Sequence, residues 1–194
     1  MPNSNTPFGF KPVKNLSNEP YNGGFSSYKI ASGYATNIFA GDVVKLLTTG
    51  YINLAGVNDQ MRGVAVGFRW INAAGAPVVN PYWPASTVTK GAQDAEIYVI
   101  DDPNIVFEAA FGNSTSVPAI ADIGASFQNF TGAAGGNTSS GNSAMGLDYS
   151  TVNTTLQQWR MLSFVTRPDN DLTSAYSRAW VTPLKHDFLT QSAI

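Results

Sequence analysis

The chain has 194 residues, of which 43% are hydrophobic and only 12% are charged, and its formal net charge is −2. A chain with this size and apolar content can bury the core of one domain or of two small ones, which excludes a disordered protein. The eleven Lys and Arg residues form no basic cluster, which argues against nucleic-acid binding. The absence of cysteine excludes disulfides, thiolate metal sites and cysteine catalysis.

Targeting and membrane segments are not indicated by the sequence. The first twelve residues, MPNSNTPFGFKP, lack the basic start and apolar core of a signal peptide. No run approaches the roughly 18 apolar residues of a membrane span. We therefore expect synthesis in a cytoplasm and no membrane partner.

Residues 1–27 read as an extended arm. Four prolines oppose regular structure there, at Pro2, Pro7, Pro12 and Pro20. Apolar anchors are spaced along the same segment, namely Phe8, Phe10, Tyr21 and Phe25. Because disordered tails are poor in aromatic residues, we expect this arm to lie on a surface, either its own body or a neighbour.

The first half of the remaining chain reads as short strands separated by turns. Residues 28–35 suggest one strand, and residues 40–55 a hairpin with a Thr-Thr-Gly turn. Residues 62–71 are rich in Val, Phe and Trp, with glycines at Gly63 and Gly67 that predict bulges or close backbone approaches. Residues 72–83 read as a loop.

A second hairpin is predicted around Asp102-Pro103-Asn104, with residues 95–101 and 105–111 as its strands. Residues 117–122 suggest a helical turn or a bridge, and residues 123–130 a strand.

The remaining segments are less uniform in character. Residues 131–146, TGAAGGNTSSGNSAMG, read as a long flexible loop. Residues 156–166 fit a helix weakly and a strand better, and residues 177–184 read as a last strand. This pattern predicts a mainly β fold, a small antiparallel barrel or sandwich. We expect a body over residues 28–188, either one domain or two sub-barrels, and a C-terminal tail over residues 189–194.

Candidate catalytic groups are sparse. The single histidine, His186, precedes Asp187, and neighbours on a strand point to opposite faces, so a triad is not indicated. Asp94 and Glu96 could form a carboxylate pair but read as solvated groups. Residues 169–171 (Asp-Asn-Asp) lack the remaining ligands of a calcium loop and read as a turn. We therefore expect no enzyme, no cofactor and no metal site.

The aromatic residues suggest either a core or a binding face. We expect Trp70 and Trp159 in the core, and we expect Tyr82 and Trp83, within Asn-Pro-Tyr-Trp-Pro, as an exposed aromatic contact. An aromatic sugar-binding face remains an alternative.

Residues 40–70 carry a resemblance to a known family. The segment contains an Ala-Gly-Asp-Val-Val start, a turn glycine, a return strand over residues 51–55 and then Gly-Val-Ala-Val-Gly, with its defining positions at Ala40, Gly41, Asp42, Gly50, Gly63 and Gly67. This layout resembles the head-decoration, or cement, proteins of tailed bacteriophages. The closing residues 177–188 are similar to structural proteins of marine podovirus-type phages.

The resemblance implies a β-tulip or SH3-like barrel with an extended arm. It implies a virion structural protein that binds the outer surface of the phage head, with the major capsid protein as partner and self-association on the shell. The contact residues would be Phe8, Phe10, Tyr21, Phe25, Tyr82 and Trp83. The alternatives are a tail or connector component and a carbohydrate-binding β module.

Overall fold

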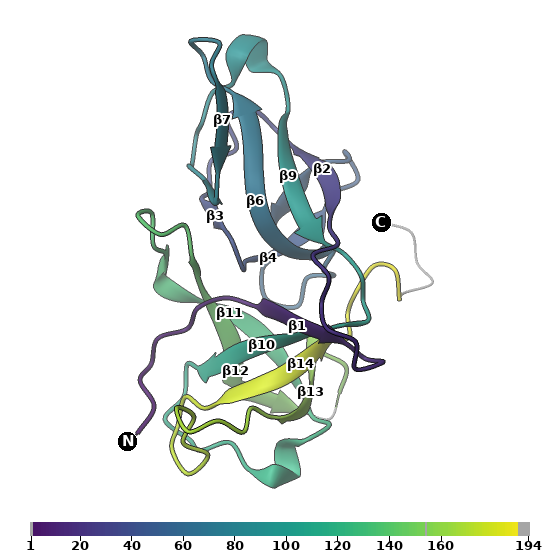
Figure 1. Ribbon diagram of the computed structural model, residues 1–194, viewed down its shortest axis with the longest axis vertical. Coiled ribbons are helices and arrows are strands. Elements are labelled where there is room, and N and C mark those ends of the chain that lie inside the picture. Colours follow the sequence, from purple (N-terminus) through teal and green to yellow (C-terminus); the bar gives the residue numbers. More distant parts are fainter. Residues whose placement is uncertain (1, 154, 190–194) are drawn as a thin grey trace.

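Two β-rich lobes lie end to end in the computed structural model, which describes residues 2–153 and 155–189, with the backbone alone for residues 132–134 (Figure 1). The barrel lobe contains β1 and β10 to β14, and the N-terminal lobe contains β2 to β9. The fold is mainly β, and the described residues contain no α-helix, only two short 3-10 turns, η1 (Lys90–Ala92) and η2 (Ile120–Asp122). The prediction of a small β barrel is therefore confirmed.

The barrel lobe is a closed five-stranded barrel. Its strand order is β10-β12-β11-β13-β14, and β14 pairs back to β10. The β10–β12 pair is parallel and the other pairs are antiparallel, while β1 extends the sheet at β10. The strands are β1 (Lys11–Asn15), β10 (Ile105–Gly112), β11 (Ser126–Gly136), β12 (Ser143–Asn153), β13 (Trp159–Phe164) and β14 (Arg178–Pro183).

The N-terminal lobe is a second, strongly curved sheet. Its strand order is β2-β9-β6-β4-β5, and β7 pairs with the far end of β6. The two ends of this sheet meet at a single bridge between Lys29 and Tyr51. The strands are β2 (Ser26–Ile30), β4 (Val43–Leu46), β5 (Ile52–Leu54), β6 (Gly63–Ile71), β7 (Pro77–Asn80), β9 (Ala95–Ile100) and the separate pair β3 (Ile38–Phe39) with β8 (Tyr82–Trp83).

One hydrophobic core crosses the boundary between the lobes. The barrel interior is filled by Phe107, Phe111, Phe127 and Trp159 together with residues of the N-terminal lobe, namely Val43, Ala55, Met61, Val64 and Ile100. A second cluster, which includes Trp70 and Trp83, fills the N-terminal lobe. Because the first cluster contains side chains from both lobes, burial of apolar surface holds the lobes together.

The first predicted hairpin is confirmed and the second is wrong. β4 and β5 pair antiparallel across the Thr-Thr-Gly turn. β9 and β10 are both strands, but β10 pairs with β1, β12 and β14 instead of with β9. The turn at residues 102–104 therefore carries the chain from one lobe to the other, and burial of both faces of β10 in the barrel outweighs the local hairpin signal.

Two predicted loops are largely strand. Residues 77–80 and 82–83 form β7 and β8, and the connection between β11 and β12 spans only residues 137–142. Cross-strand pairs such as Thr131 with Met145 and Gly136 with Ser143 extend the β11–β12 ribbon through the glycine-rich stretch. Tertiary pairing here overrides low strand propensity.

Residues 1–27 are not a separate arm. β1 pairs with β10, and the Phe10 side chain is buried in the barrel lobe. The alternative in which the segment packs on its own body therefore holds for residues 9–15. The tail predicted for residues 189–194 lies outside the described residues, apart from Leu189.

Candidate interaction groove

An apolar groove of about 350 Å³ lies between the N-terminal segment and the N-terminal lobe. Phe8, Phe10, Tyr21 and Phe25 line one side, and β6 residues, including Val66, line the other. Four of the six predicted contact residues are thus brought together, although they are separated by up to seventeen positions in the chain. We call this feature the waist groove.

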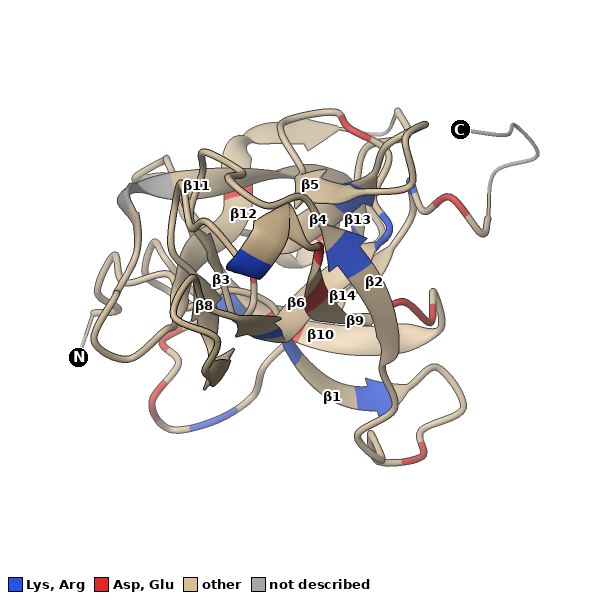
Figure 2. Cartoon of the chain, turned by 90° about the horizontal axis from the view of Figure 1, so that it is seen from above, with Lys and Arg blue, Asp and Glu red and all other residues tan. Residues whose placement is uncertain are grey.

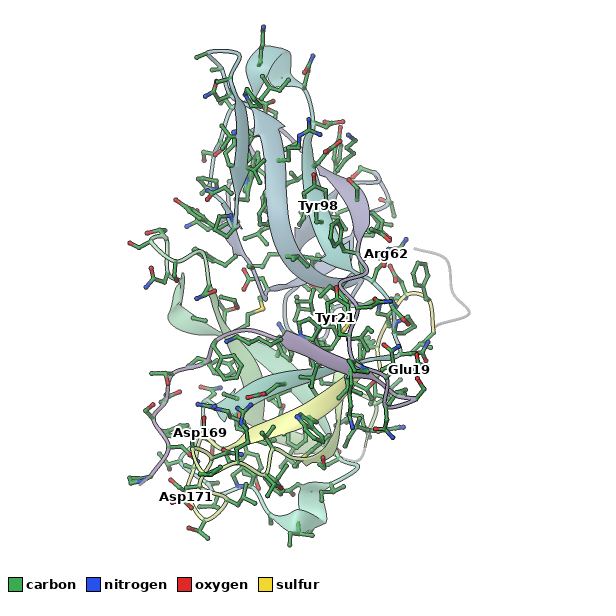
Figure 3. All side chains as sticks on the ribbon, in the orientation of Figure 1. Glu19, Tyr21, Arg62, Tyr98, Asp169 and Asp171 are labelled. Carbon is green, nitrogen blue, oxygen red and sulfur yellow. The ribbon has the colours of Figure 1, made fainter. Side chains whose placement is uncertain are left out.

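Tyr21 and Phe25 are held in place by local contacts. The Tyr21 backbone N–H donates to the Val13 carbonyl at 3.1 Å, and its hydroxyl donates to the Gly24 carbonyl at 2.6 Å. Burial raises the pKa of Tyr21 above its ordinary value, so the hydroxyl stays protonated at neutral pH. The Phe25 ring packs on Tyr98 with centroids 5.2 Å apart. In Figure 3 Tyr21 lies at the level where the two lobes meet, and Tyr98 lies above it on the N-terminal lobe.

A β-bulge places Val66 in the groove. The register of β6 against β9 shifts between Ala65 and Gly67, so Val66 is the extra residue of β6. Bulges re-aim side chains, and the Val66 side chain is 39% exposed although it lies in a strand with buried neighbours. The predicted bulge near Gly67 is confirmed. Val66 itself was missed as a site residue, since only the adjacent glycine signalled it.

Three chain segments meet next to the groove, and they contribute Phe10, Gly41 and Asn142 to its lining. Gly9 donates to the Met145 carbonyl at 2.9 Å, and Phe10 donates to the Gly41 carbonyl at 3.0 Å. A Cβ on Gly9 would lie 2.8 Å from the Ser143 Cβ. Only a residue without a side chain allows this approach, and the positive φ of 81° at Gly9 also favours glycine.

Asp42 connects two of these segments by hydrogen bonds. Its carboxylate accepts hydrogen bonds from the Phe39 backbone N–H at 2.7 Å and from the Ser143 hydroxyl at 2.5 Å. Burial raises the pKa of Asp42 to about 6, and the two hydrogen bonds only partly oppose that rise. The Ala-Gly-Asp motif at residues 40–42 therefore serves the contact between the lobes.

The charge at the edge of the groove is positive. The Lys11 ammonium lies 4.6 Å from the Phe8 ring centroid, and the Arg178 guanidinium lies 5.4 Å from the same centroid. Both contacts are cation–π interactions with the Phe8 ring. Elsewhere Lys, Arg, Asp and Glu are scattered over both lobes without a face of one sign (Figure 2).

The remaining two predicted contact residues lie away from the groove. Trp83 is fully buried, packs edge-on against Trp70 and donates from Nε1 to the Tyr34 carbonyl at 3.2 Å. The prediction that Trp83 is an exposed contact is therefore wrong, because an indole with a satisfied N–H packs well in a core. Tyr82 is half-buried and stacks on Phe39. Burial of Trp70 and Trp159 agrees with the prediction.

The region around the single histidine is a buried polar cluster. Arg62 pairs with Asp187 at 3.1 Å, and its Nε donates to the Tyr28 hydroxyl at 2.9 Å. Its guanidinium also lies 4.1 Å from the Phe188 ring centroid. Burial lowers the pKa of His186, which favours the neutral imidazole. This cluster fixes the segment around residues 185–189 against the N-terminal lobe.

The two carboxylates of the Asp-Asn-Asp sequence at residues 169–171 form local contacts within the protein. Asp169 lies in the predicted turn and pairs with Arg178 at 2.7 Å, and Asp171 accepts from the Thr173 backbone N–H and hydroxyl. Within residues 2–153 and 155–189 no group of three or more His, Asp or Glu side chains is placed to hold a metal ion. The same residues include no helix of the length and hydropathy that a membrane span needs.

Comparisons of the chain with protein-family models, with curated proteins and with solved structures found no match.

Proposed function

We propose that this protein is a structural component of a phage particle that binds the outer surface of the head. It would act as a decoration or cement protein, bridge neighbouring subunits of the major capsid protein and associate with further copies of itself on the shell. The proposed activity is binding, and it requires neither a chemical step nor a cofactor.

The waist groove is the observation that carries this proposal. It gathers Phe8, Tyr21 and Phe25 beside Val66 on a face that is partly open. Apolar surface that remains exposed in a folded chain is typical of protein interaction sites. The groove also lies where the two lobes meet, so a bound partner would contact both lobes at once.

Three further features support a role in an assembly. The surface carries few charges, which reduces long-range repulsion between closely packed copies. The two lobes share a core, so the molecule can transmit load along its length without a hinge between them. Residues 40–70 carry the resemblance to head-decoration proteins, and this segment contributes Val43, Ala55, Met61 and Val64 to the core that the two lobes share.

Binding to the shell can be strong even when each contact is modest. A decorated head offers many equivalent sites, and a protein that contacts two subunits or a second copy of itself gains from effective concentration. The proposal therefore needs only a moderate affinity at the waist groove.

The test is cryo-electron microscopy of the particle that contains this chain, followed by rebinding. Density for the two lobes on the outer shell between capsid subunits is the expected result. Purified protein should also restore occupancy on heads that lack it, and Val66→Asp should reduce that occupancy while Val79→Asp, on the exposed strand β7, should not. Density at the tail or portal, or failure of the wild-type protein to bind heads, would contradict the proposal.

A further inference from the structure

The waist groove exposes apolar side chains on both of its walls. Phe25 is 54% exposed on the N-terminal segment, and Val66 is 39% exposed on β6. The β6 bulge turns Val66 outward, and Val66 therefore has no residue opposite it on β9 in the strand register. A volume of about 350 Å³ is small, so an occupant contributes a few side chains rather than a whole domain.

Among residues 2–153 and 155–189, no carboxylate lies within ion-pair distance of Lys11 at the groove edge. Lys11 is exposed, lines the groove and contacts the Phe8 ring, and within the described part of the chain it forms no ion pair. The neighbouring Arg178, in contrast, pairs with Asp169 and Glu108. Lys11 is therefore the charge at this site that a partner can complement.

We propose that the waist groove binds an extended segment of a partner protein that carries apolar side chains with a carboxylate beside them, the carboxylate pairing with Lys11. An extended backbone presents alternate side chains to one face, so two or three apolar residues can enter the groove while the polar ones face away. The inference rests on the proposed function in that the partner would be a shell protein.

The test uses the full chain and fluorescent octapeptides with blocked termini, in which Val and Phe alternate with Ser. One set carries Asp at either end, a second set carries Lys at the same positions, and a third carries only Ser there. Fluorescence anisotropy gives the dissociation constants. We expect the Asp peptides to bind at least about fivefold more tightly than the Lys peptides, which is the scale of one partly exposed ion pair.

Three variants assign the contact to the groove. Lys11→Glu should reverse the preference, so that the Lys peptides bind more tightly than the Asp peptides. Val66→Asp should weaken every peptide about tenfold or more, because it places a charge against the apolar segment. Val79→Asp is the matched control on the same sheet, where valine is 75% exposed, and should leave all the dissociation constants unchanged.

The outcomes separate this inference from the proposed function. Equal binding of Asp and Lys peptides, or an unchanged preference in Lys11→Glu, would overturn the inference. So would equal weakening by Val66→Asp and Val79→Asp, or no peptide binding by a wild-type protein that still attaches to heads. Peptide binding with the expected preference, by a protein that does not attach to heads, would leave the inference standing and remove the phage role.

Discussion

The Phe10 ring stacks on the indole of Trp159, with ring centroids 4.1 Å apart and the planes 9° from parallel. Both side chains are buried, 1% and 0% exposed respectively. The contact joins the segment before β1 to β13, almost 150 residues later in the chain. Removal of residues 1–27 would therefore take an aromatic ring out of the barrel core and β1 off the edge of the sheet, so truncation is expected to unfold the barrel lobe.

Replacement of Phe10 by Ala tests this contact without truncation. Loss of a buried aromatic side chain should lower the free energy of unfolding by about 3–5 kcal/mol. Phe25→Ala is the control on the same segment, and because that ring is largely exposed its cost should stay below about 1 kcal/mol. Urea unfolding followed by tryptophan fluorescence measures both. Similar values for the two variants would contradict the placement of Phe10.

Gly9→Ala tests the close approach at the junction. The new Cβ would stand 2.8 Å from the Ser143 Cβ and 2.9 Å from the Gly41 Cα. Gly33→Ala is a matched control, since Gly33 has a similar φ of 78° and no atom within 4 Å of the added Cβ. Both variants bear the left-handed strain of about 1–2 kcal/mol, and Gly9→Ala should cost about 1–3 kcal/mol more. Thermal unfolding of the two variants measures the difference between their stabilities. Equal stabilities would show that the backbone segments at Gly9 are not closely packed.

Asp42 should make stability depend on pH. Its pKa in the folded protein is about 6, above the ordinary value of 3.8. Between these two pH values the Asp42 carboxyl is protonated in the folded protein and ionised in the unfolded chain. The contribution of Asp42 to the free energy of unfolding is therefore greatest below about pH 4, and it is lost as the pH rises through 6. The difference between the pKa of about 6 and the ordinary value of 3.8 corresponds to roughly 3 kcal/mol of unfolding free energy.

Asp42→Asn removes the titration while an amide can still accept from the Phe39 N–H. The difference in unfolding free energy between wild type and variant should therefore change by about 3 kcal/mol in favour of the variant between pH 4 and pH 8. Urea titrations at five pH values measure it. A difference that stays constant across this range would show that Asp42 is not buried as described.

Arg62→Ala tests the ion pair with Asp187, whose side chain is 4% exposed. Loss of a buried cation leaves the facing carboxylate poorly compensated, and we expect a cost of about 3–5 kcal/mol. Lys29→Ala is the surface control, because the Lys29–Glu96 pair is largely exposed and worth less than about 1 kcal/mol. The double variant Arg62→Ala with Asp187→Ala should recover part of the loss in chemical unfolding. If the loss of unfolding free energy in the double variant equals the sum of the losses in the two single variants, Arg62 and Asp187 do not form a direct ion pair.

Strands can be predicted from this sequence where hydrophobic pattern and turn signals agree. The hairpin of β4 and β5, the bulge near Gly67 and the last strand were predictable because local signals and final pairing coincide. The partners of β10 were not predictable, because the Asp-Pro-Asn turn favours a hairpin that burial in the barrel overrides. The sequence predicts Phe8, Phe10, Tyr21 and Phe25 as anchors spaced along one extended segment. That they gather on one wall of a groove, with Val66 on the opposite wall, requires knowledge of the fold.

The glycine-rich stretch was misread for a physical reason. A Cβ on Gly136 would overlap the Phe39 ring at 2.4 Å, and one on Gly146 would lie 2.6 Å from the Ala110 carbonyl oxygen. Glycine is used there because other groups occupy the space next to the backbone. Composition alone cannot separate this use of glycine from a flexible linker.

The junction at Gly9 also constrains how the protein is made. Its partner strand β12 begins at Ser143, and the ring that covers Phe10 arrives only with Trp159. On the ribosome the first segment therefore leaves the tunnel long before the residues that bury it. Folding of the barrel lobe must wait for nearly the whole chain, and until then the exposed Phe8 and Phe10 rings are open to chaperones and to aggregation.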